Sequence, residues 1–289
     1  MPYTVTFWGT RGSIPTPGPH TARYGGNTSC VSVAAGGDRL VVFDAGTGVR
    51  PLGLAIDGAS RGPLNLDILI THTHWDHIQG LPFFKPLFRA GNKVRIFGTS
   101  QEDISLETIL ERQNHPAVFP IPLRALAAEL RVTEIRPGQK FEVDGFQVET
   151  IQLRHPGTTL AYRLTPSEGG ASMAYVTDNE LGSGGSYDVP ADWRARLVAF
   201  LGGVDLLIHD GMYSDELLRV RAGWGHSSPT EAVALAAECK AKRLVLFHHE
   251  PDHDDAAIDR LLSGARSAAV RSAPTLVVDA AMEGLTFTL

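Results

Sequence analysis

The chain has 289 residues, of which 43% are hydrophobic and 20% charged, and its formal net charge is −6 from 26 basic and 32 acidic residues. This is globular composition, so the chain can bury a sizeable core, and long disordered stretches are not expected. Proteins that bind a long phosphate backbone usually carry a basic stripe, and none is visible. The composition argues against long nucleic acid as the main partner, but not against a small anionic substrate.

Cysteine usage and hydropathy indicate the compartment. Cys30 and Cys239 lie far apart, so we expect two buried, reduced thiols rather than a disulfide framework. The N-terminus lacks a basic patch followed by an apolar run. No apolar run approaches the ~18 residues that span a bilayer. The expected protein is cytoplasmic and has no membrane contact.

Taken in chain order, the pattern alternates strands and helices. Short apolar runs predict strands over 5–8, 31–34, 40–43, 66–70, 94–97, 146–153, 160–164, 173–176, 206–208 and 244–247. Helical periodicity predicts helices over 105–112, 123–130, 229–239 and 256–268. No repeat or linker divides the chain, so we expect a single domain over residues 1–289 with an α/β or α+β sandwich fold.

The segment after the predicted strand 66–70 is rich in metal-binding side chains. It presents His72, His74, Asp76 and His77 within six positions. On an extended chain His72 and His74 point to the same side and can bind one metal together. Asp76 and His77 follow where the chain turns, and they can address a second metal. Imidazole and carboxylate suit zinc, manganese or iron. A polar turn that binds nothing is one alternative; a structural zinc site is another, but cysteines normally complete such sites.

This His-x-His-x-Asp-His pattern after a strand resembles the metallo-β-lactamase-fold superfamily, a four-layer αββα sandwich with a two-metal site at one edge. The resemblance implies two divalent ions, zinc with manganese or iron as alternatives, about 3.5–4 Å apart so that a bridging hydroxide can form. It also implies His155 as a ligand of the first metal, Asp178 as a bridging ligand and His248 as a ligand of the second, with the adjacent His249 as the alternative. Asp44 resembles the aspartate that orients ligands in this family.

Two later segments resemble ribonuclease Z and its small-molecule relatives. Residues 224–233 resemble their Gly-His-Ser-Thr element, and strand 205–210 ends on Asp210, where those relatives carry an acidic residue that contacts the element's histidine. The resemblance implies that His226, held by Asp210, assists the leaving oxygen of a phosphodiester, and that Asp76 can take a proton from the attacking water. His209 is expected to face the layer behind the sheet.

The expected reaction is hydrolysis of small or cyclic, cyclic-nucleotide-like phosphodiesters through the metal-bridging hydroxide. The long arm by which ribonuclease Z grips transfer RNA is not evident, and residues 102–130 predict a pocket cover instead. Three alternatives stay open. One is a lactone, ester or β-lactam hydrolase, which would not need His226. The others are a sulfur dioxygenase with one iron and a catalytically silent binding module. The sequence also leaves a homodimer open.

Overall fold

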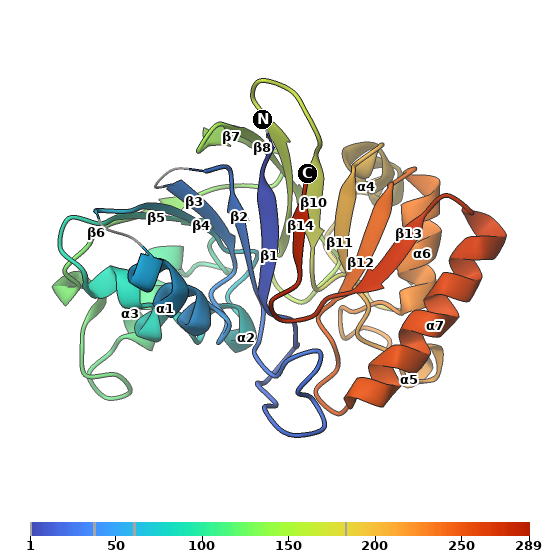
Figure 1. Cartoon of the computed structure of the whole chain (residues 1–289), viewed down its shortest axis with the longest axis horizontal. Coiled ribbons are helices and arrows are strands. Elements are labelled where there is room, and N and C mark those ends of the chain that lie inside the picture. Colours follow the sequence, from blue (N-terminus) through green and yellow to red (C-terminus); the bar gives the residue numbers. More distant parts are fainter. Residues whose placement is uncertain (1, 37–38, 60–61, 183) are drawn as a thin grey trace.

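Two mixed β-sheets lie face to face in the computed structural model, which describes residues 2–36, 39–59, 62–182 and 184–289 (Figure 1). The first sheet consists, in spatial order, of β14 (Thr286–Thr288), β1 (Thr4–Gly9), β2 (Cys30–Ala34), β3 (Arg39–Phe43), β4 (Asn65–Leu69), β5 (Lys93–Gly98) and β6 (Glu129–Glu134). The second consists of β13 (Val277–Ala280), β12 (Arg243–Phe247), β11 (Leu206–Asp210), β10 (Met173–Val176), β9 (Leu160–Pro166), β8 (Phe146–Gln152) and β7 (Lys140–Val143).

Helices cover the outer face of each sheet, which confirms the predicted αββα sandwich (Figure 1). They are α1 (Val49–Ala59), α2 (Trp75–Ile78), α3 (Leu106–Gln113), α4 (Trp193–Leu201), α5 (Asp215–Val220), α6 (Pro229–Glu238) and α7 (Asp255–Ser272), with 3-10 turns at Leu81–Phe83, Lys85–Phe88 and Leu123–Ala125. Helices α1 and α3 pack on the first sheet, whereas α4, α6 and α7 pack on the second. The short helices α2 and α5 lie at one end of the sandwich (Figure 1).

The core between the sheets explains why buried and half-buried residues alternate along the strands. Successive residues of β1 are alternately half-buried and buried, because neighbouring side chains of a strand point to opposite faces. The inner faces meet in an aromatic cluster in which Phe43 stacks on Tyr175 at 4.8 Å between ring centroids and Tyr175 contacts Phe247 edge-on. Burial of such rings supplies much of the hydrophobic stabilisation.

Parallel strands bring the chemistry to one edge. Strands β3 to β6 run parallel, as do β10 to β13. The candidate ligands follow the carboxyl ends of β4, β8, β10 and β12, and their side chains converge. The carboxyl ends of both sheets therefore face the same site, as expected for open α/β sheets.

One predicted helix is wrong. Residues 123–130 form a single 3-10 turn at Leu123–Ala125, and the chain then enters β6 at Glu129. Strand β6 pairs in parallel with β5, with Val94 opposite Leu130 and Ile96 opposite Val132. The alanine- and leucine-rich composition favours a helix locally, but hydrogen bonding to a buried neighbouring strand outweighs that preference.

Two smaller expectations can be compared with the structure. Cys30 and Cys239 are both free and buried, as predicted. Among the described residues, no helix combines the length and the apolar character that crossing a bilayer requires.

Candidate metal centre

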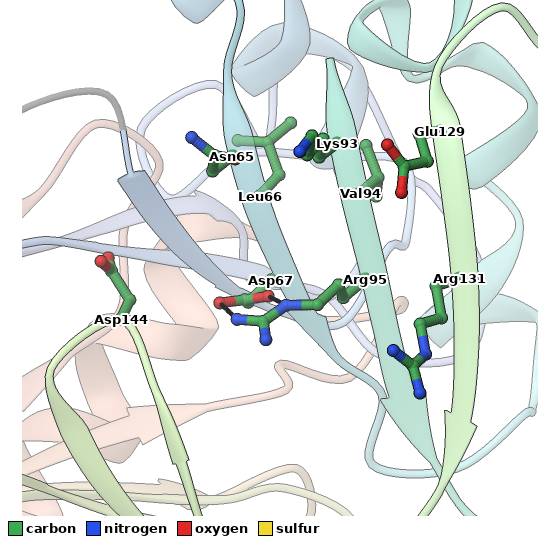
Figure 2. A pocket seen from close by; sticks show the side chains of 9 residues that line it. All are labelled: Asn65, Leu66, Asp67, Lys93, Val94, Arg95, Glu129, Arg131 and Asp144. Carbon is green, nitrogen blue, oxygen red and sulfur yellow. Dashed lines mark hydrogen bonds and ion pairs between the residues drawn. The ribbon is translucent and has the colours of Figure 1, made fainter. Parts of the chain in front are cut away.

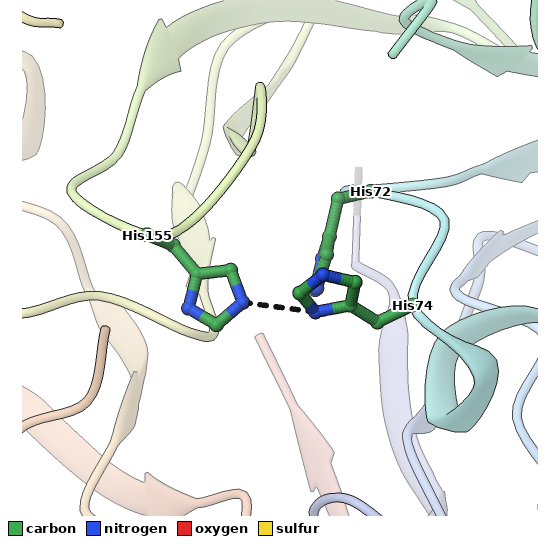
Figure 3. Close-up of side chains that lie close together, drawn as sticks. All are labelled: His72, His74 and His155. Carbon is green, nitrogen blue, oxygen red and sulfur yellow. Dashed lines mark hydrogen bonds between the residues drawn. The ribbon is translucent and has the colours of Figure 1, made fainter. Parts of the chain in front are cut away.

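Three imidazoles form the first cluster of candidate ligands (Figure 3). His72, His74 and His155 offer ring nitrogens that all lie within 4.8 Å of one another. The Nε2 of His155 is 3.0 Å from the Nδ1 of His74. His72 and His155 are buried, whereas His74 is exposed. The first cluster is therefore open to solvent on the side of His74.

Two carboxylates and two imidazoles form the second cluster. Asp76, His77, Asp178 and His248 are all buried, and their ligand atoms lie within 4.8 Å of one another. The Oδ2 of Asp76 is 3.0 Å from the Nε2 of His248 and 3.2 Å from the Nε2 of His77. His249, the alternative to His248, instead directs its Nε2 at the carbonyl of Ala281, 2.9 Å away.

Asp178 lies between the two clusters. Its Oδ1 is 3.2 Å from the Nε2 of both His77 and His248. Its Oδ2 is 3.8 Å from the Nε2 of His72 and 3.7 Å from that of His155. One carboxylate thus presents a different oxygen to each cluster, which is the arrangement that a bridging ligand requires.

The turn after β4 sets these positions. His74 adopts an extended conformation (φ −62°, ψ 152°), and α2 begins directly after it at Trp75. His72 and His74 therefore share one side of an extended segment, whereas the single turn of α2 directs Asp76 and His77 back toward the core. One local sequence supplies ligands to both clusters in this way.

Asp44 fixes the orientation of the second cluster. Its carboxylate accepts hydrogen bonds from the backbone N–H of Thr71 (2.8 Å), from Nδ1 of His77 (2.8 Å) and from the hydroxyl of Tyr175 (3.0 Å). Because Nδ1 of His77 donates to Asp44, its Nε2 is left to face Asp76 and Asp178. Sequence reasoning found Asp44 but missed Tyr175, which precedes Asp178 by three positions.

The loop after β1 closes the second cluster from the opposite side. The backbone N–H of Ser13 donates to Oδ2 of Asp76 at 2.7 Å. A Cβ added to Gly12 would lie only 2.4 Å from the ring of His248, so only glycine allows this close approach. These contacts were not predicted from the sequence; the Gly9-Thr10-Arg11-Gly12 turn was the only signal.

Charge and burial suit divalent cations. Burial lowers the pKa of His72, and the neighbouring His77 lowers it further, so its imidazole is neutral. Burial alone would raise the pKa of Asp178, but His248 and His77 hold it well below its ordinary value. The Nε2 of His72 is buried and forms no hydrogen bond with any described residue. A neutral imidazole, an ionised carboxylate and an unpartnered buried nitrogen are what a bound metal ion would satisfy.

His226 and Asp210 form an ion pair next to both clusters. The Nδ1 of His226 is 2.7 Å from Oδ2 of Asp210, and the ring stacks on His248 with centroids 5.2 Å apart. A ring nitrogen of His226 also lies within 4.8 Å of ligand atoms of His155 and Asp178. Burial would lower the pKa of His226, but the Asp210 carboxylate outweighs it and raises the pKa to about 9. His226 is therefore a buried cation at neutral pH.

Glu180 holds the loop that carries His226, and sequence reasoning missed it. Its carboxylate accepts from the backbone N–H groups of Gly223 (2.8 Å) and Gly225 (3.1 Å). The carbonyl of Gly225 accepts in turn from Nδ1 of His155 at 3.0 Å, which leaves Nε2 of His155 to face the cluster. His209 is buried and contacts Asn179 on the helix side of the sheet, apart from both clusters, as predicted.

A hollow of about 380 Å³, whose lining includes no residue of the two clusters, lies over β4, β5 and β6 (Figure 2). It is lined by Asn65, Leu66, Asp67, Lys93, Val94, Arg95, Glu129, Arg131 and Asp144. Asp67 and Arg95 form a two-pronged ion pair there, with N–O distances of 2.6 and 2.7 Å. Apart from Asp144, which lies in the turn between β7 and β8, these residues come from the first three positions of β4, β5 and β6, and none is a candidate ligand. The reaction site is therefore the edge with the histidines.

Comparisons with known proteins agree with this geometry. Residues 39–249 match the family described as the beta-lactamase superfamily domain. The chain is 27% identical to ribonuclease Z of Archaeoglobus fulgidus, with 86% of this chain and 87% of that protein covered.

Two solved structures share the fold. A diphosphatase of the PhnP family superposes with a TM-score of 0.67 at 20% identity, covering 100% of this chain and 98% of that one. The short form of human tRNase Z gives a TM-score of 0.64 at 20% identity, with 98% of each chain covered. The names of these relatives, which refer to ribonuclease activity and transfer RNA, run against the expectation that long nucleic acid is not the main partner.

Proposed function

Because the chain belongs to the beta-lactamase superfamily domain family and is a metal-dependent hydrolase, we propose that it is a two-metal phosphodiesterase that acts on small or cyclic phosphodiesters. We propose zinc as the metal, held by His72, His74 and His155 on one side and by Asp76, His77 and His248 on the other, with Asp178 shared. Relatives named ribonuclease Z support phosphodiesters as the substrate class.

The observation that carries the proposal is the His226–Asp210 pair. A phosphodiester transition state places negative charge on the leaving oxygen, so a proton donor beside that oxygen accelerates the reaction. A buried imidazolium next to both clusters, held by a carboxylate at 2.7 Å, provides such a donor. Hydrolysis of a lactone or an activated ester has less need of one.

Each of these side chains has a role in the proposed reaction. Bound divalent cations would lower the pKa of water and screen the phosphoryl oxygens. Asp76, anchored by the N–H of Ser13, accepts a proton from the attacking water. Asp210 stabilises the imidazolium by accepting a hydrogen bond from its Nδ1–H. His226 donates its Nε2 proton to the leaving oxygen and becomes a neutral imidazole that keeps its Nδ1 proton.

Two features of the chain support a small substrate. The net charge is −6, which opposes the approach of a long polyanion. The segment 102–130 packs beside the centre rather than extending as an arm: Leu106 and Leu110 of α3 are buried, and Phe119 contacts Phe83 edge-on at 5.4 Å between centroids.

The proposal is tested with a substrate panel and one variant. The zinc-loaded protein should hydrolyse bis(p-nitrophenyl) phosphate and cyclic nucleotides in preference to lactones and thioesters. His226→Ala should lower kcat/KM by about 10²- to 10⁴-fold for cyclic nucleotides, whose alkoxide leaving group needs a proton. The loss should be smaller for p-nitrophenolate, which leaves unprotonated. The exposed His20 gives a matched control, His20→Ala. Strong lactone turnover without phosphodiester turnover would overturn the proposal.

A further inference from the structure

A mostly apolar pocket of about 540 Å³ opens between α2 and α3. It is lined by Thr73, Trp75, Ile78, Gln79, Ile109, Arg112, Gln113 and Val118. Its volume is in the range of pockets that bind small organic molecules. None of these residues has a role in the proposed chemistry, so the pocket needs a separate explanation.

The pocket and the first cluster share one stretch of backbone. Thr73 stands between His72 and His74, and Trp75 follows His74 directly. His74 is the exposed member of the first cluster. The pocket and the clusters thus lie on two sides of the same segment. A substrate whose phosphate lies at the clusters would extend over the exposed His74 to place its organic group in the pocket.

The walls favour a planar ring. The side chain of Trp75 is 81% exposed although α2 lies beside a buried site, and Val118 opposite is 73% exposed. Large apolar side chains that gather on a surface around a hollow mark a binding site more often than chance exposure does. An exposed tryptophan ring offers a flat face on which an aromatic ligand can stack.

Polar groups on the pocket wall add specificity. Gln113 donates from Nε2 to the carbonyl of Ile78 at 2.8 Å, whereas its Oε1 is buried and has no hydrogen-bond partner among the described residues. Arg112 carries an exposed guanidinium at the same wall. An amide acceptor and a fixed cation beside a stacking face match the ring N–H donors and ring acceptors of a nucleobase.

We propose that this pocket, which we call the Trp75 pocket, binds the nucleobase of a nucleotide phosphodiester. The inference rests on the proposed function and narrows its substrate class from small phosphodiesters to nucleotides. Trp75 stacks on the base, Gln113 accepts a hydrogen bond from its edge, and the phosphate lies over His74.

The first test compares substrates with and without a base. The ratio of kcat/KM for adenosine 2′,3′-cyclic phosphate to that for 1-O-methylribose 2′,3′-cyclic phosphate should fall about tenfold in Trp75→Ala, since stacking of one base commonly contributes this much. Trp75→Phe should keep most of the ratio because it retains a ring. Val270→Ala, which removes a comparably exposed apolar side chain on α7, should leave the ratio unchanged. An unchanged ratio in Trp75→Ala would overturn the pocket assignment.

The second test needs no catalysis. Adenosine, which has no phosphate, should bind the zinc-loaded protein in calorimetry, and the affinity should fall about tenfold in Trp75→Ala and less in Trp75→Phe. If adenosine binds in this way but no phosphodiester is hydrolysed, the pocket stands and the proposed function fails. If phosphodiesters are hydrolysed but adenosine does not bind, only the pocket fails. A dimer that dissociates in Trp75→Ala, seen by sedimentation, would assign this surface to a second copy and overturn the inference.

Discussion

The two ligand clusters share the short segment His72–His77, yet they differ in charge and in the residues that hold their ligands in place. The first consists of three imidazoles, one of them exposed. The second is fully buried, contains the Asp76 carboxylate, and is held by Asp44 on one side and by the N–H of Ser13 on the other. The second cluster is thus positioned by the folded chain, whereas the first is left open where a substrate can approach.

The two clusters also differ in the protonation of their imidazoles. Burial lowers the pKa of His155 to about 4, so its imidazole is free to bind a metal. Burial would also lower the pKa of His77, but Asp76 and Asp178 raise it well above the ordinary value. A metal that binds the second cluster must displace that proton, whereas a metal at the first cluster displaces none at neutral pH. Metal affinity should therefore depend on pH more steeply at the second cluster.

Replacing Asp178, the ligand that both clusters share, should weaken metal binding at both of them. Asp178→Asn removes the negative charge that both clusters share and replaces one of its two oxygens by an NH2 group that cannot bind a metal. We expect metal to be lost from the centre and kcat to fall by at least about a thousandfold, because the pKa of water is no longer lowered. Metal content by mass spectrometry and turnover of bis(p-nitrophenyl) phosphate measure this. The surface variant Asp192→Asn is the control. Retention of two metals per chain would contradict the bridging role.

Weakening the hydrogen bonds made by Asp44 should affect the second cluster more than the first. In Asp44→Asn the orienting partner of His77 is weakened, and we expect metal affinity there to fall about 10- to 100-fold, as for other groups that orient metal ligands. The first cluster should lose less affinity, since His72 is linked to Asp44 only through the hydroxyl of Thr71, which lies 3.0 Å from the Asp44 carboxylate and 3.2 Å from Nδ1 of His72. Competition with a chromophoric chelator resolves the two affinities. An equal loss at both would mean that the clusters form one cooperative unit.

The pH dependence of turnover should report on His226, the proposed proton donor, rather than on the metal ligands. His226 is protonated below its pKa of about 9, so cyclic-nucleotide turnover should be present below that pH and lost as the pH rises through it. Asp210→Asn removes the carboxylate that raises this pKa, so the alkaline limb should move to lower pH, toward the ordinary value of 6.5. The resulting loss at pH 8 should be about tenfold. A limb that stays in place would show that another group titrates.

The smallest effect is expected at the edge of the second cluster. Tyr175→Phe removes one hydrogen bond to Asp44, while those from Thr71 and His77 remain. A single neutral hydrogen bond contributes about 1 kcal/mol, so metal affinity at the second cluster should fall no more than about fivefold. Chelator competition measures the change, and a loss as large as that of Asp44→Asn would assign Tyr175 a larger part.

How much of the site could be predicted from the sequence depends on how far apart along the chain the contacting residues lie. The ligands of the His72–His77 segment are neighbours in the sequence, and the later candidate ligands could be predicted from their order at strand ends. In the structure these residues lie together. The supports could not be anticipated, because Ser13 lies 63 positions from Asp76, and Tyr175 lies 131 positions from Asp44. The error at residues 123–130 has the same origin: pairing with β5 is a tertiary interaction that local composition does not report.

The loop after β1 brings the metal centre into contact with residues from the first and the last parts of the chain. Arg11 is fully buried, and its guanidinium donates to the carbonyls of Gly25 and Glu250, while Gly12 abuts His248. The second cluster is thus complete only when the first residues and the last third of the chain have met, so an unfolded chain holds no such site. Metals that bind only the folded form stabilise it by mass action, by about 2.7 kcal/mol at a hundredfold excess over Kd. The free energy of unfolding should therefore depend on metal supply, as should the rate of the reaction.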